Sequence, residues 1–269
     1  MEKGINKVKL YVKKTNKASK VYEKVYNSLL SNNFKIVEDN SDLVISIGGD
    51  GTFLKMLHEN NFDNKSYYAS INAGSLGFLS SIDRSRVDDF IKMIKNNKFI
   101  IREINPLTIK VYKEKEIIEL NCLNELTIRK TDFSSLRCDI LVNDKILDQY
   151  VGDGIIVNSS IGSTGYNLAL GGPIIDRDIK AYSITPIVPI VNSVYKSLTN
   201  SFVLDMNKKT TFILNKTNNI SIVTDGKVYN IDNITKVECL LSKKTIKCLM
   251  ASDYDYIKNI KTKIIDYGG

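Results

Sequence analysis

The sequence predicts a mixed fold: an N-terminal open α/β domain, then a β-sandwich-like all-β domain, and a C-terminal tail that packs back on the first domain. Two observations predict it. Within the first hundred residues, apolar positions switch between the two-residue period of strands and the helical period. After about Ile100, apolar residues fall almost entirely into short, β-branched, alternating runs. We expect the domains to span 1–100 and 101–252, and the tail 253–269.

The first domain is expected to alternate strand and helix. Residues 7–13 alternate in period two, as a strand does, whereas Val21, Val25 and Leu29 recur every four residues, as on one face of a helix. The remaining elements are short apolar strands and one more helix, at 34–37, 43–47, 67–71 and 87–94. This is the βαβ pattern of a mostly parallel sheet.

The second domain is expected to consist of strands joined by tight turns such as Asn143-Asp144 and Asp225-Gly226. The predicted strands are 107–112, 116–123, 125–130, 138–143, 145–151, 154–159, 210–215, 220–224 and 236–241. One helical piece, 163–170, interrupts them and is ended by Gly171-Gly172-Pro173. The stretch 254–265 is expected to be an amphipathic helix or an extended arm.

Composition limits the kind of protein. The chain has 269 residues, 43% of them hydrophobic, which is enough for a sizeable core. No apolar run reaches the ~18–20 residues that cross a bilayer, and the N-terminus lacks a signal-peptide core, so we expect a soluble cytoplasmic protein. The net charge of +8 comes almost entirely from lysine, and the arginines do not cluster. We therefore expect no nucleic-acid or membrane partner, although a positive field helps to recruit a polyphosphate ligand.

The cysteines and the single histidine offer no catalytic or metal-binding pattern. The four cysteines show no C-x-x-C spacing, and we expect them to be small core residues. A mechanism of the Ser–His–Asp or Cys–His type would have to use His58, which lies in a predicted helix.

A glycine-rich turn carries the first chemical signal. Gly48-Gly49-Asp50-Gly51-Thr52 follows the strand 43–47, and a helix is expected to begin at Thr52. Glycines let backbone N–H groups approach a phosphate, and a helix N-terminus favours its charge. Asp50 would repel a phosphate, so it is expected to take a proton from a hydroxyl or to help hold a magnesium ion. The alternative is a plain turn with an aspartate cap.

Two further segments carry polar groups beside apolar strands. The run 72–79 (NAGSLGFL) also follows a strand, and its Phe78 is either a platform for a base or a core residue. In the block 152–175, Asp153 precedes a strand and 162–167 opens a short helix. Hydroxyls, an amide and free N–H groups gathered in this way are typical of a site for a hydrogen-bonding ligand.

These segments together resemble the NAD kinase family, the ATP-NAD kinases. The resemblance rests on GGDGT at 48–52, NAGSLGFL at 72–79, Asn124-Glu125, the block 152–175 and TDGK at 224–227. It covers most of the chain. GGDGT by itself is shared with diacylglycerol and sphingosine kinases, and the block 152–175 is the more specific element. Gly165 and Gly226 depart from the alanine and histidine found in relatives.

The resemblance implies transfer of the terminal phosphoryl group of ATP, or of polyphosphate, to the 2′-hydroxyl of the adenosine ribose of NAD, giving NADP. Asp50 matches the general base. The residues expected to contact phosphate or ATP, in the matching turn and directly after it, are Gly48, Gly49, Gly51, Thr52 and Lys55.

The resemblance also implies the NAD contacts. Asn124 and Glu125 match the pair that holds the ribose and adenine, and Asp225 an acidic residue near the reacting ribose. Asp153 matches a residue at the nicotinamide end. The other implied contacts are Asp50, Gly51, Phe78 against the adenine, Thr164, Gly165, Tyr166 as a stacking partner, Asn167, Ala169 and the backbone of Val188.

The family further implies a divalent metal ion, with Mg²⁺ expected, and a homodimer or homotetramer. Two other functions remain open. A GGDGT-type lipid kinase would have to admit an acyl chain and would not need the polar segment 162–167. A non-catalytic dinucleotide sensor, or a basic nucleic-acid-binding protein, would share the scaffold, but it would not need Asp50 or Asn124-Glu125.

Overall fold

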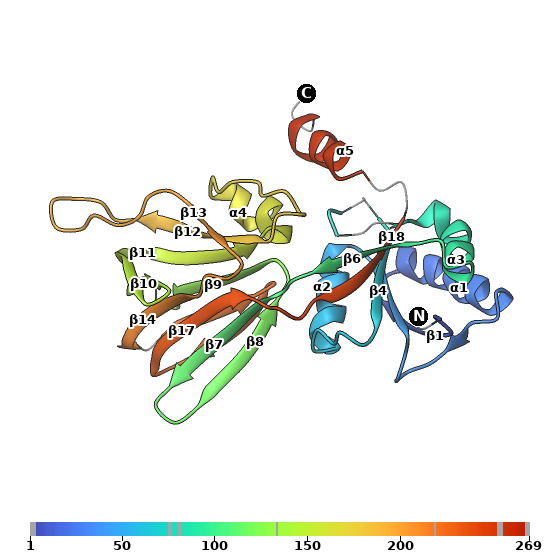
Figure 1. Ribbon diagram of the computed structural model, residues 1–269, viewed down its shortest axis with the longest axis horizontal. Coiled ribbons are helices and arrows are strands. Elements are labelled where there is room, and N and C mark those ends of the chain that lie inside the picture. The colour runs from blue at the N-terminus through green and yellow to red at the C-terminus, as the bar shows by residue number, and fades with distance from the viewer. Residues whose placement is uncertain are drawn as a thin grey trace. The chain divides into compact units, whose positions relative to one another are not determined.

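The computed structural model describes residues 4–74, 77–79, 82–132, 134–217, 219–251 and 255–266. The chain divides into two compact units (Figure 1). The first unit comprises Met1–Ile104 and Thr245–Gly269, and the second comprises Asn105–Lys244. Each unit is built around its own apolar core.

The first unit is a seven-stranded sheet with helices packed on it. Its strands run in the order β2-β1-β3-β4-β18-β6, and β5 pairs with β4. All the pairings are parallel except that of β6 with β18. Its elements are β1 (Lys7–Val12), α1 (Asn16–Ser31), β2 (Lys35–Ile36), β3 (Leu43–Gly48), α2 (Asp50–Glu59), β4 (Tyr67–Asn72), β5 (Ile82–Asp83), η1 (Arg84–Arg86), α3 (Val87–Lys95), β6 (Ile100–Ile104), β18 (Ile246–Met250), α5 (Tyr256–Ile260) and η3 (Lys261–Ile265).

Apolar periodicity explains how this unit packs. Val21, Val25 and Leu29 of α1 join alternate residues of β3 and the apolar face of α3 in one buried cluster. Residues buried from α2 lie outside that cluster, and α2 covers the opposite face of the sheet (Figure 1). The predicted open α/β domain is confirmed. Burial of both faces accounts for the largely apolar sequences of β3 and β4, in which every residue is buried.

The start of α2 corrects one expectation. The helix begins at Asp50 rather than at Thr52, with Gly49 as its N-cap. The Gly49 carbonyl accepts hydrogen bonds from the N–H groups of Thr52 and Phe53. A carboxylate in the first turn is favoured by the positive end of the helix dipole, so Asp50 joins the helix instead of preceding it.

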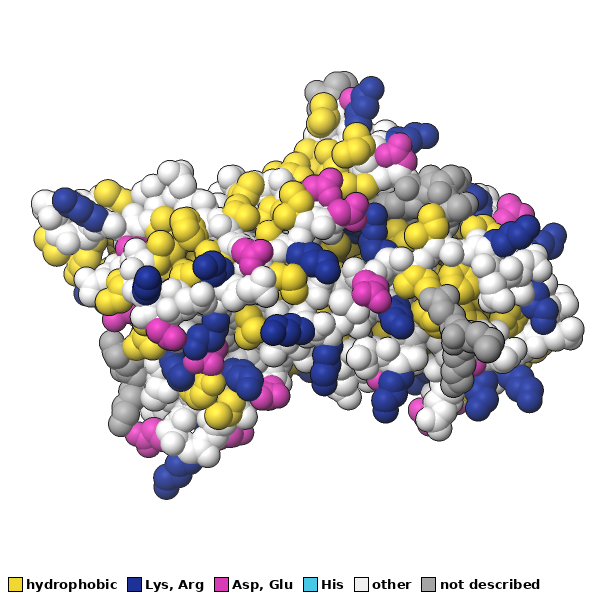
Figure 2. Space-filling model, in the orientation of Figure 1, with side chains coloured by type: hydrophobic (Ala, Val, Ile, Leu, Met, Phe, Trp, Pro, Cys, Tyr) yellow, Lys and Arg dark blue, Asp and Glu magenta, His cyan; other side chains and the backbone are white. Residues whose placement is uncertain are grey.

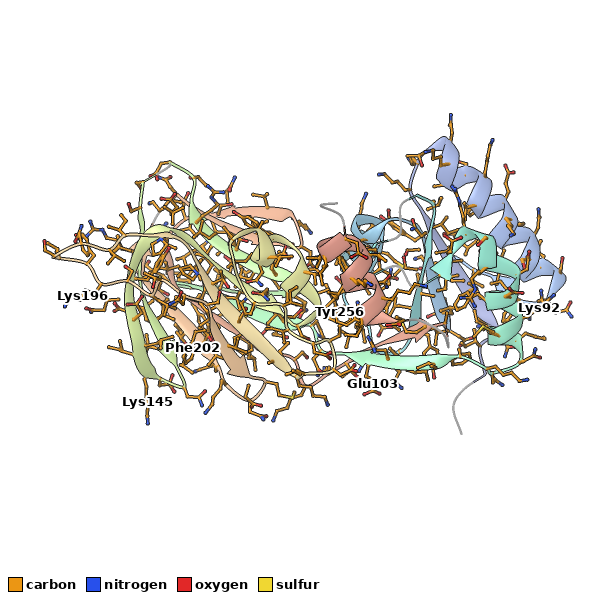
Figure 3. All side chains as sticks on the ribbon, turned by 90° about the horizontal axis from the view of Figure 1, so that it is seen from above. Lys92, Glu103, Lys145, Lys196, Phe202 and Tyr256 are labelled. Atoms are coloured by element: carbon orange, nitrogen blue, oxygen red, sulfur yellow. The ribbon has the colours of Figure 1, made fainter. Side chains whose placement is uncertain are left out.

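The C-terminal tail, predicted at 253–269, belongs to the first unit, as expected. Strand β18 precedes the tail and also belongs to the first unit, although the sequence analysis assigns its residues to the second domain; it pairs in parallel with β4 and antiparallel with β6. The tail contains α5, which begins at the labelled Tyr256 in Figure 3, and a π-helical turn. From that turn, Lys263 donates a hydrogen bond from Nζ to the Gly77 carbonyl and lies 4.7 Å from the centre of the Phe78 ring.

The second unit is an eleven-stranded sheet that folds on itself. Its strands run in the order β16-β15-β9-β11-β10-β14-β17-β7-β8, with β12 pairing with β11 and β13. Its elements are β7 (Leu107–Lys113), β8 (Ile117–Cys122), β9 (Glu125–Lys130), β10 (Leu136–Val142), β11 (Lys145–Ser159), η2 (Ile161–Thr164), α4 (Tyr166–Ala169), β12 (Ala181–Pro189), β13 (Phe202–Asp205), β14 (Thr210–Thr217), β15 (Ile220–Thr224), β16 (Lys227–Ile231) and β17 (Ile234–Leu241).

One core explains why the sheet curls. Strands β8 and β15 are distant in the sheet order, yet they pack together. Leu107 of β7 and Ile222 of β15 belong to the same buried cluster. This is the sandwich-like arrangement that the alternating runs predict, because a single-sided apolar sheet must cover its own face. In Figure 3, Lys145 marks the start of β11 and Phe202 the start of β13.

A single strand, β11, replaces two predicted ones. The sequence analysis separates 145–151 from 154–159 and expects Asp153 to precede the second of these strands. In the structure, Gly152 and Gly154 continue the strand and serve close packing instead. A β-carbon on Gly152 would overlap the Tyr150 hydroxyl, and one on Gly154 would lie 2.7 Å from the Ile128 carbonyl oxygen.

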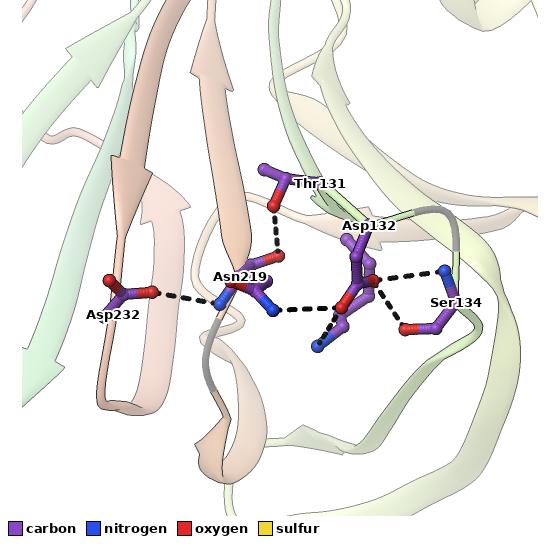
Figure 4. A network of polar contacts seen from close by, with 6 residues as sticks. Thr131, Asp132, Ser134, Asn219 and Asp232 are labelled. Carbon is purple, nitrogen blue, oxygen red and sulfur yellow. Dashed lines mark hydrogen bonds and ion pairs between the residues drawn. The ribbon is translucent and has the colours of Figure 1, made fainter.

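The predicted turns are present. Asn143 and Asp144 both have positive φ, as do Asp225 and Gly226, the pairing that a two-residue type I′ hairpin requires. A polar network ties the end of β9 to the residues just before β15 (Figure 4). Asp132 accepts hydrogen bonds from the Ser134 hydroxyl and N–H and from the Asn219 amide, and these bonds lower its pKa to about 2.

Burial and surface charge agree with the composition. All four cysteines are buried, as expected of core residues. His58 lies in α2 with its ring edge-on to Phe62. On the face shown in Figure 2, basic and acidic side chains are interspersed. Within the described residues, no helix is both long enough and apolar enough to cross a membrane.

Candidate functional site

The glycine turn lies at the edge of the sheet where two parallel strands end. Gly48 ends β3 and pairs in register with Asn72 at the end of β4, so the two carboxyl ends lie side by side. A β-carbon on Gly48 would overlap the Thr52 side chain, which is buried over it, whereas β-carbons on Gly49 and Gly51 would meet nothing within 4 Å. The backbone of these two glycines is therefore open to a ligand.

Asp50 is held by the second glycine segment. Its carboxylate accepts hydrogen bonds from the backbone N–H groups of Phe78, at 2.7 Å, and Leu79, at 3.1 Å. A β-carbon on Gly77 would overlap that carboxylate. The structure thus brings together residues from GGDGT and from NAGSLGFL. Ser75 and Leu76 of the latter lie outside the described residues.

Lys55 lies one turn further along α2 and faces solvent. Its side chain is 71% exposed, and Nζ lies 3.8 Å from a carboxylate oxygen of Glu59. Its expected contact with ATP stays a prediction.

In the second unit, a carboxylate organises the Asn124-Glu125 pair. Asp225, in the β15–β16 turn, accepts hydrogen bonds from the N–H groups of Leu123 and Asn124, both at 2.7 Å, and of Glu125 at 3.4 Å. The positive φ of Asp225 belongs to the type I′ turn. The three acidic and amide residues that the sequence singles out at 124, 125 and 225 therefore form one cluster.

This cluster contains a carboxyl group with a raised pKa and buried polar atoms that lack hydrogen-bond partners. Burial and, to a smaller extent, the nearby negative charge of Asp225 together raise the pKa of Glu125 to about 7. The Oδ1 atom of Asn124 and the hydroxyl of Thr224 are buried and have no hydrogen-bond partner among the described residues. Buried polar atoms without partners are rare, and at a surface cluster they indicate a place for a ligand.

The segment η2–α4 packs directly on this cluster. A β-carbon on Gly162 would overlap the Asn124 backbone, and one on Gly165 would lie 3.8 Å from a carboxylate oxygen of Glu125. Three expected contact residues of the segment, Gly165, Tyr166 and Ala169, are exposed, and Thr164 is partly buried.

Asn167 occupies a different position from these neighbours. Its side chain is fully buried, and its amide nitrogen donates to the carbonyls of Ser163 and Pro173. Its amide oxygen accepts from the Thr185 hydroxyl at 2.7 Å. These bonds hold α4 against β12, and a contact of Asn167 with NAD stays a prediction.

Asp153 and Val188 face each other on neighbouring strands. They lie between the register pairs Gly152–Pro189 and Gly154–Ile187, and both are exposed. The φ of Val188 is 45°, a strained value for a β-branched residue. Asn158, which pairs with Glu125, lies five positions after Asp153 in β11, a span of ~17 Å along the strand. The structure does not bring this pair to the Asn124 cluster.

Sequence reasoning missed part of the glycine-turn region. Lys13, Thr15 and Lys17, from the connection of β1 to α1, line a cavity of about 610 Å³ together with Gly49 and Asn72. The signal that was available is the threonine N-cap in KKTNK, directly after a strand. Another hollow, of about 790 Å³ on β10 and β11, contains none of the predicted site residues.

Two features define the class of protein. One is an open glycine turn on an α/β sheet with a carboxylate fixed inside it, and the other is a polar cluster on a β-rich unit. Together they define a two-unit phosphotransferase that binds a nucleotide. The chain belongs to the NAD kinase family. The model of the ATP-NAD kinase N-terminal domain matches residues 1–99, and that of the ATP-NAD kinase C-terminal domain matches residues 123–249.

Curated relatives agree with this assignment. The NAD kinase of Clostridium beijerinckii is 34% identical over 241 residues, which cover 87% of this chain and 83% of the relative. The NAD kinase of Fusobacterium nucleatum is 31% identical over 256 residues, covering 92% of each chain. Like these relatives, this protein is a phosphotransferase.

Solved structures share the fold. Yeast NADH kinase complexed with NADH superposes with a TM-score of 0.86 at 17% identity, covering 100% of this chain and 89% of that one. An NAD kinase from Archaeoglobus fulgidus in complex with ATP gives a TM-score of 0.76 at 19% identity, covering 95% and 97%.

Proposed function

We propose that this NAD kinase transfers the terminal phosphoryl group of ATP to the 2′-hydroxyl of the adenosine ribose of NAD, with Asp50 as general base. One observation carries the proposal: a carboxylate stands between two open glycines at the N-terminus of α2 and is oriented by two backbone N–H groups. Phosphoryl transfer depends mainly on positioning and on stabilising charge, and a base on the attacking oxygen completes it.

Asp50 meets the geometric needs of a base. The hydrogen bonds from Phe78 and Leu79 fix the orientation of a carboxylate, a group that can take a proton from a substrate hydroxyl. The same bonds keep the side chain from turning back to cap its own helix. The exposed N–H groups of Gly49 and Gly51 are suited to contact a phosphate.

The second-unit cluster is suited to the adenosine half of NAD. The unpartnered Oδ1 of Asn124 can accept a hydrogen bond from a ribose hydroxyl or the adenine amine, and Glu125 stands beside it. The carboxylate oxygens of Asp225 accept hydrogen bonds from backbone N–H groups, so we assign Asp225 the role of holding Asn124 and Glu125 in place. Further contacts in the proposal come from Phe78, Thr164, Gly165, Tyr166, Asn167 and Ala169, and at the nicotinamide end from Asp153 and Val188.

A magnesium ion fits this site as a companion of the donor. The described residues contain no group of three or more His, Cys, Asp or Glu side chains arranged to hold a metal. Mg²⁺ usually binds through one or two carboxylates together with substrate phosphates and water, and Asp50 is the carboxylate that the glycine turn supplies. When bound, the ion would neutralise charge on the phosphates.

The choice of donor is part of the proposal. The A. fulgidus enzyme of similar fold was solved with ATP, which supports a nucleoside triphosphate here. Inorganic polyphosphate offers the same phosphate chain, so it stays an alternative donor.

We also propose a homodimer or homotetramer, which light scattering of the purified protein would reveal.

The test is a substrate comparison. The protein is incubated with Mg²⁺ and ATP and either NAD or diacylglycerol, and NADP is measured with an NADP-specific dehydrogenase. We expect NADP and no phosphorylated lipid. Lipid phosphorylation without NADP would assign the protein to the lipid kinases. If neither product forms, the remaining assignment is a non-catalytic dinucleotide-binding protein. A parallel reaction with polyphosphate identifies the donor.

A further inference from the structure

The C-terminal tail contains a π-helical turn with one partly buried lysine. Helix α5 (Tyr256–Ile260) passes directly into this turn, η3 (Lys261–Ile265). π-Helical turns are rare, usually single, and frequent at functional sites. Within the turn, Lys263 is partly buried, whereas Lys261 is exposed. Lys263 is therefore the charged residue that the turn directs onto the rest of the first unit.

Lys263 contacts the segment between β4 and β5. Its Nζ donates a hydrogen bond to the Gly77 carbonyl and lies 4.7 Å from the centre of the Phe78 ring, which is within the range of a cation–π contact. Residues 77–79 belong to no helix or strand. Because neither a helix nor a sheet fixes their peptide planes, tertiary contacts such as that of Lys263 have to orient them.

One peptide group links Lys263 to Asp50. The Gly77 carbonyl and the Phe78 N–H belong to the same planar unit, so a contact that orients one orients the other. The carbonyl accepts a hydrogen bond from Lys263, and the N–H donates one to the Asp50 carboxylate at 2.7 Å. A cationic donor on the carbonyl oxygen also polarises the peptide and strengthens donation by its N–H, because hydrogen bonds in a chain are cooperative.

We propose that Lys263 is a positioning residue for Asp50. It fixes the peptide between Gly77 and Phe78, and that peptide in turn holds the carboxylate of the base. The C-terminal tail thereby takes part in the reaction without touching either reactant. The proposal rests on the proposed function, because Lys263 acts through the base. Its loss should lower kcat and leave the binding of NAD and ATP largely unchanged.

Three variants test the contact. Lys263→Met keeps the length and the apolar stem of the side chain but removes the donor and the charge. Lys263→Arg keeps both, and Lys261→Met removes an exposed charge from the same turn. Steady-state kinetics measure kcat and the KM for NAD and ATP, and thermal unfolding measures the melting temperature. The matched change in net charge in Lys261→Met controls for long-range electrostatics.

We expect Lys263→Met to lower kcat at least ~10-fold with both KM values within ~3-fold of wild type, because a small misplacement of a catalytic group is costly. Lys263→Arg and Lys261→Met should keep kcat within ~3-fold of wild type, since each leaves a cation on the Gly77 carbonyl. Wild-type kcat in Lys263→Met, or a raised KM at unchanged kcat, would overturn the proposal. An equal loss of kcat in Lys263→Arg or in Lys261→Met would also overturn it.

A double-mutant cycle with Asp50→Asn separates positioning from a merely structural role. If Lys263 acts through Asp50, adding Lys263→Met to Asp50→Asn should lower kcat by no more than ~3-fold beyond Asp50→Asn alone. A loss of folded protein would lower kcat by the same factor in both backgrounds, and such multiplied losses would overturn the proposal. Lys263→Gln, which also lacks the charge, replaces Lys263→Met in the cycle if that variant does not fold.

The cycle also distinguishes failure of this proposal from failure of the proposed function. Absence of NADP from the wild type, or near-wild-type turnover in Asp50→Asn, rejects the proposed function or its base, and the role of Lys263 falls with it. If Asp50→Asn loses turnover while Lys263→Met keeps it, only the role of Lys263 is wrong.

Discussion

The carboxylate of Asp50 occupies the space in which a side chain on Gly77 would begin. A β-carbon built on Gly77 would overlap all three atoms of that carboxylate group. The following N–H groups, of Phe78 and Leu79, donate to its two oxygens. Because Gly77 has no side chain, the backbone that follows it can approach Asp50. The two N–H groups of that backbone then position the proposed base.

Gly77→Ala should lower kcat by at least ~10-fold while leaving the melting temperature within a few degrees of wild type. The methyl group would push the Asp50 carboxylate away from its two N–H donors, and small misplacements of a catalytic group are costly. Steady-state kinetics with thermal unfolding measure both effects. Gly4→Ala, which meets open space, is the control. Wild-type kcat in Gly77→Ala would show that the contact does not position the base.

Asp50→Asn should lower turnover by at least ~10²-fold and leave NAD binding in place. The amide keeps the size of the side chain but cannot take a proton, and loss of a general base typically costs 10²–10⁴-fold. Stopped assays give turnover, and calorimetric titration gives the NAD constant. Turnover within a few-fold of wild type would assign the base to another group.

Glu125→Gln should stabilise the protein at pH 8 but not at pH 4. Because the folded protein raises the pKa of Glu125 from 4.5 to about 7, it binds that proton more tightly than the unfolded chain does. The contribution of Glu125 is therefore fully present below pH 4.5 and is lost as pH rises to about 7. The full loss corresponds to at most about 3 kcal/mol.

Urea unfolding at a series of pH values measures this effect. The wild type should lose stability relative to Glu125→Gln between about pH 4.5 and 7, with no further divergence above pH 8. Glu119→Gln, at an exposed carboxylate, should track the wild type. Parallel curves for wild type and Glu125→Gln would mean that Glu125 is not perturbed by burial and Asp225.

Asp153→Ala should raise the apparent KM for NAD by roughly ten- to a hundredfold and leave that for ATP nearly unchanged. The loss of a hydrogen bond to a charged acceptor costs about 1.5–3 kcal/mol. Because Asp153 is exposed on β11, the substitution should not affect folding. A rise in the ATP constant instead would place Asp153 at the donor site and reverse the proposed orientation of NAD.

The sequence alone determined the fold class and much of the candidate site, because both depend on local patterns. Apolar periodicity located α1, β3, β4 and the alternating strands of the second unit. The glycines after β3 indicated where the backbone is exposed, and the Asp225-Gly226 pair indicated where the chain reverses. Both signals are local, because the conformational freedom of a glycine or turn residue is a property of that residue itself. The GGDGT turn was identified in the same way, whereas the pair Asn124-Glu125 was identified only through the resemblance to the NAD kinase family.

Only the tertiary structure decided features that depend on pairing between distant residues. The alternation of β18 reads like that of its predecessors in the second unit, and only its pairing with β4 and β6 assigns it to the first. The glycines beside Asp153 read as a turn, yet packing against Tyr150 and Ile128 makes them part of one strand. Likewise Lys13, Lys17 and Asn72 meet at one cavity because parallel strands bring their carboxyl ends to the same edge of a sheet, a proximity that no local pattern encodes.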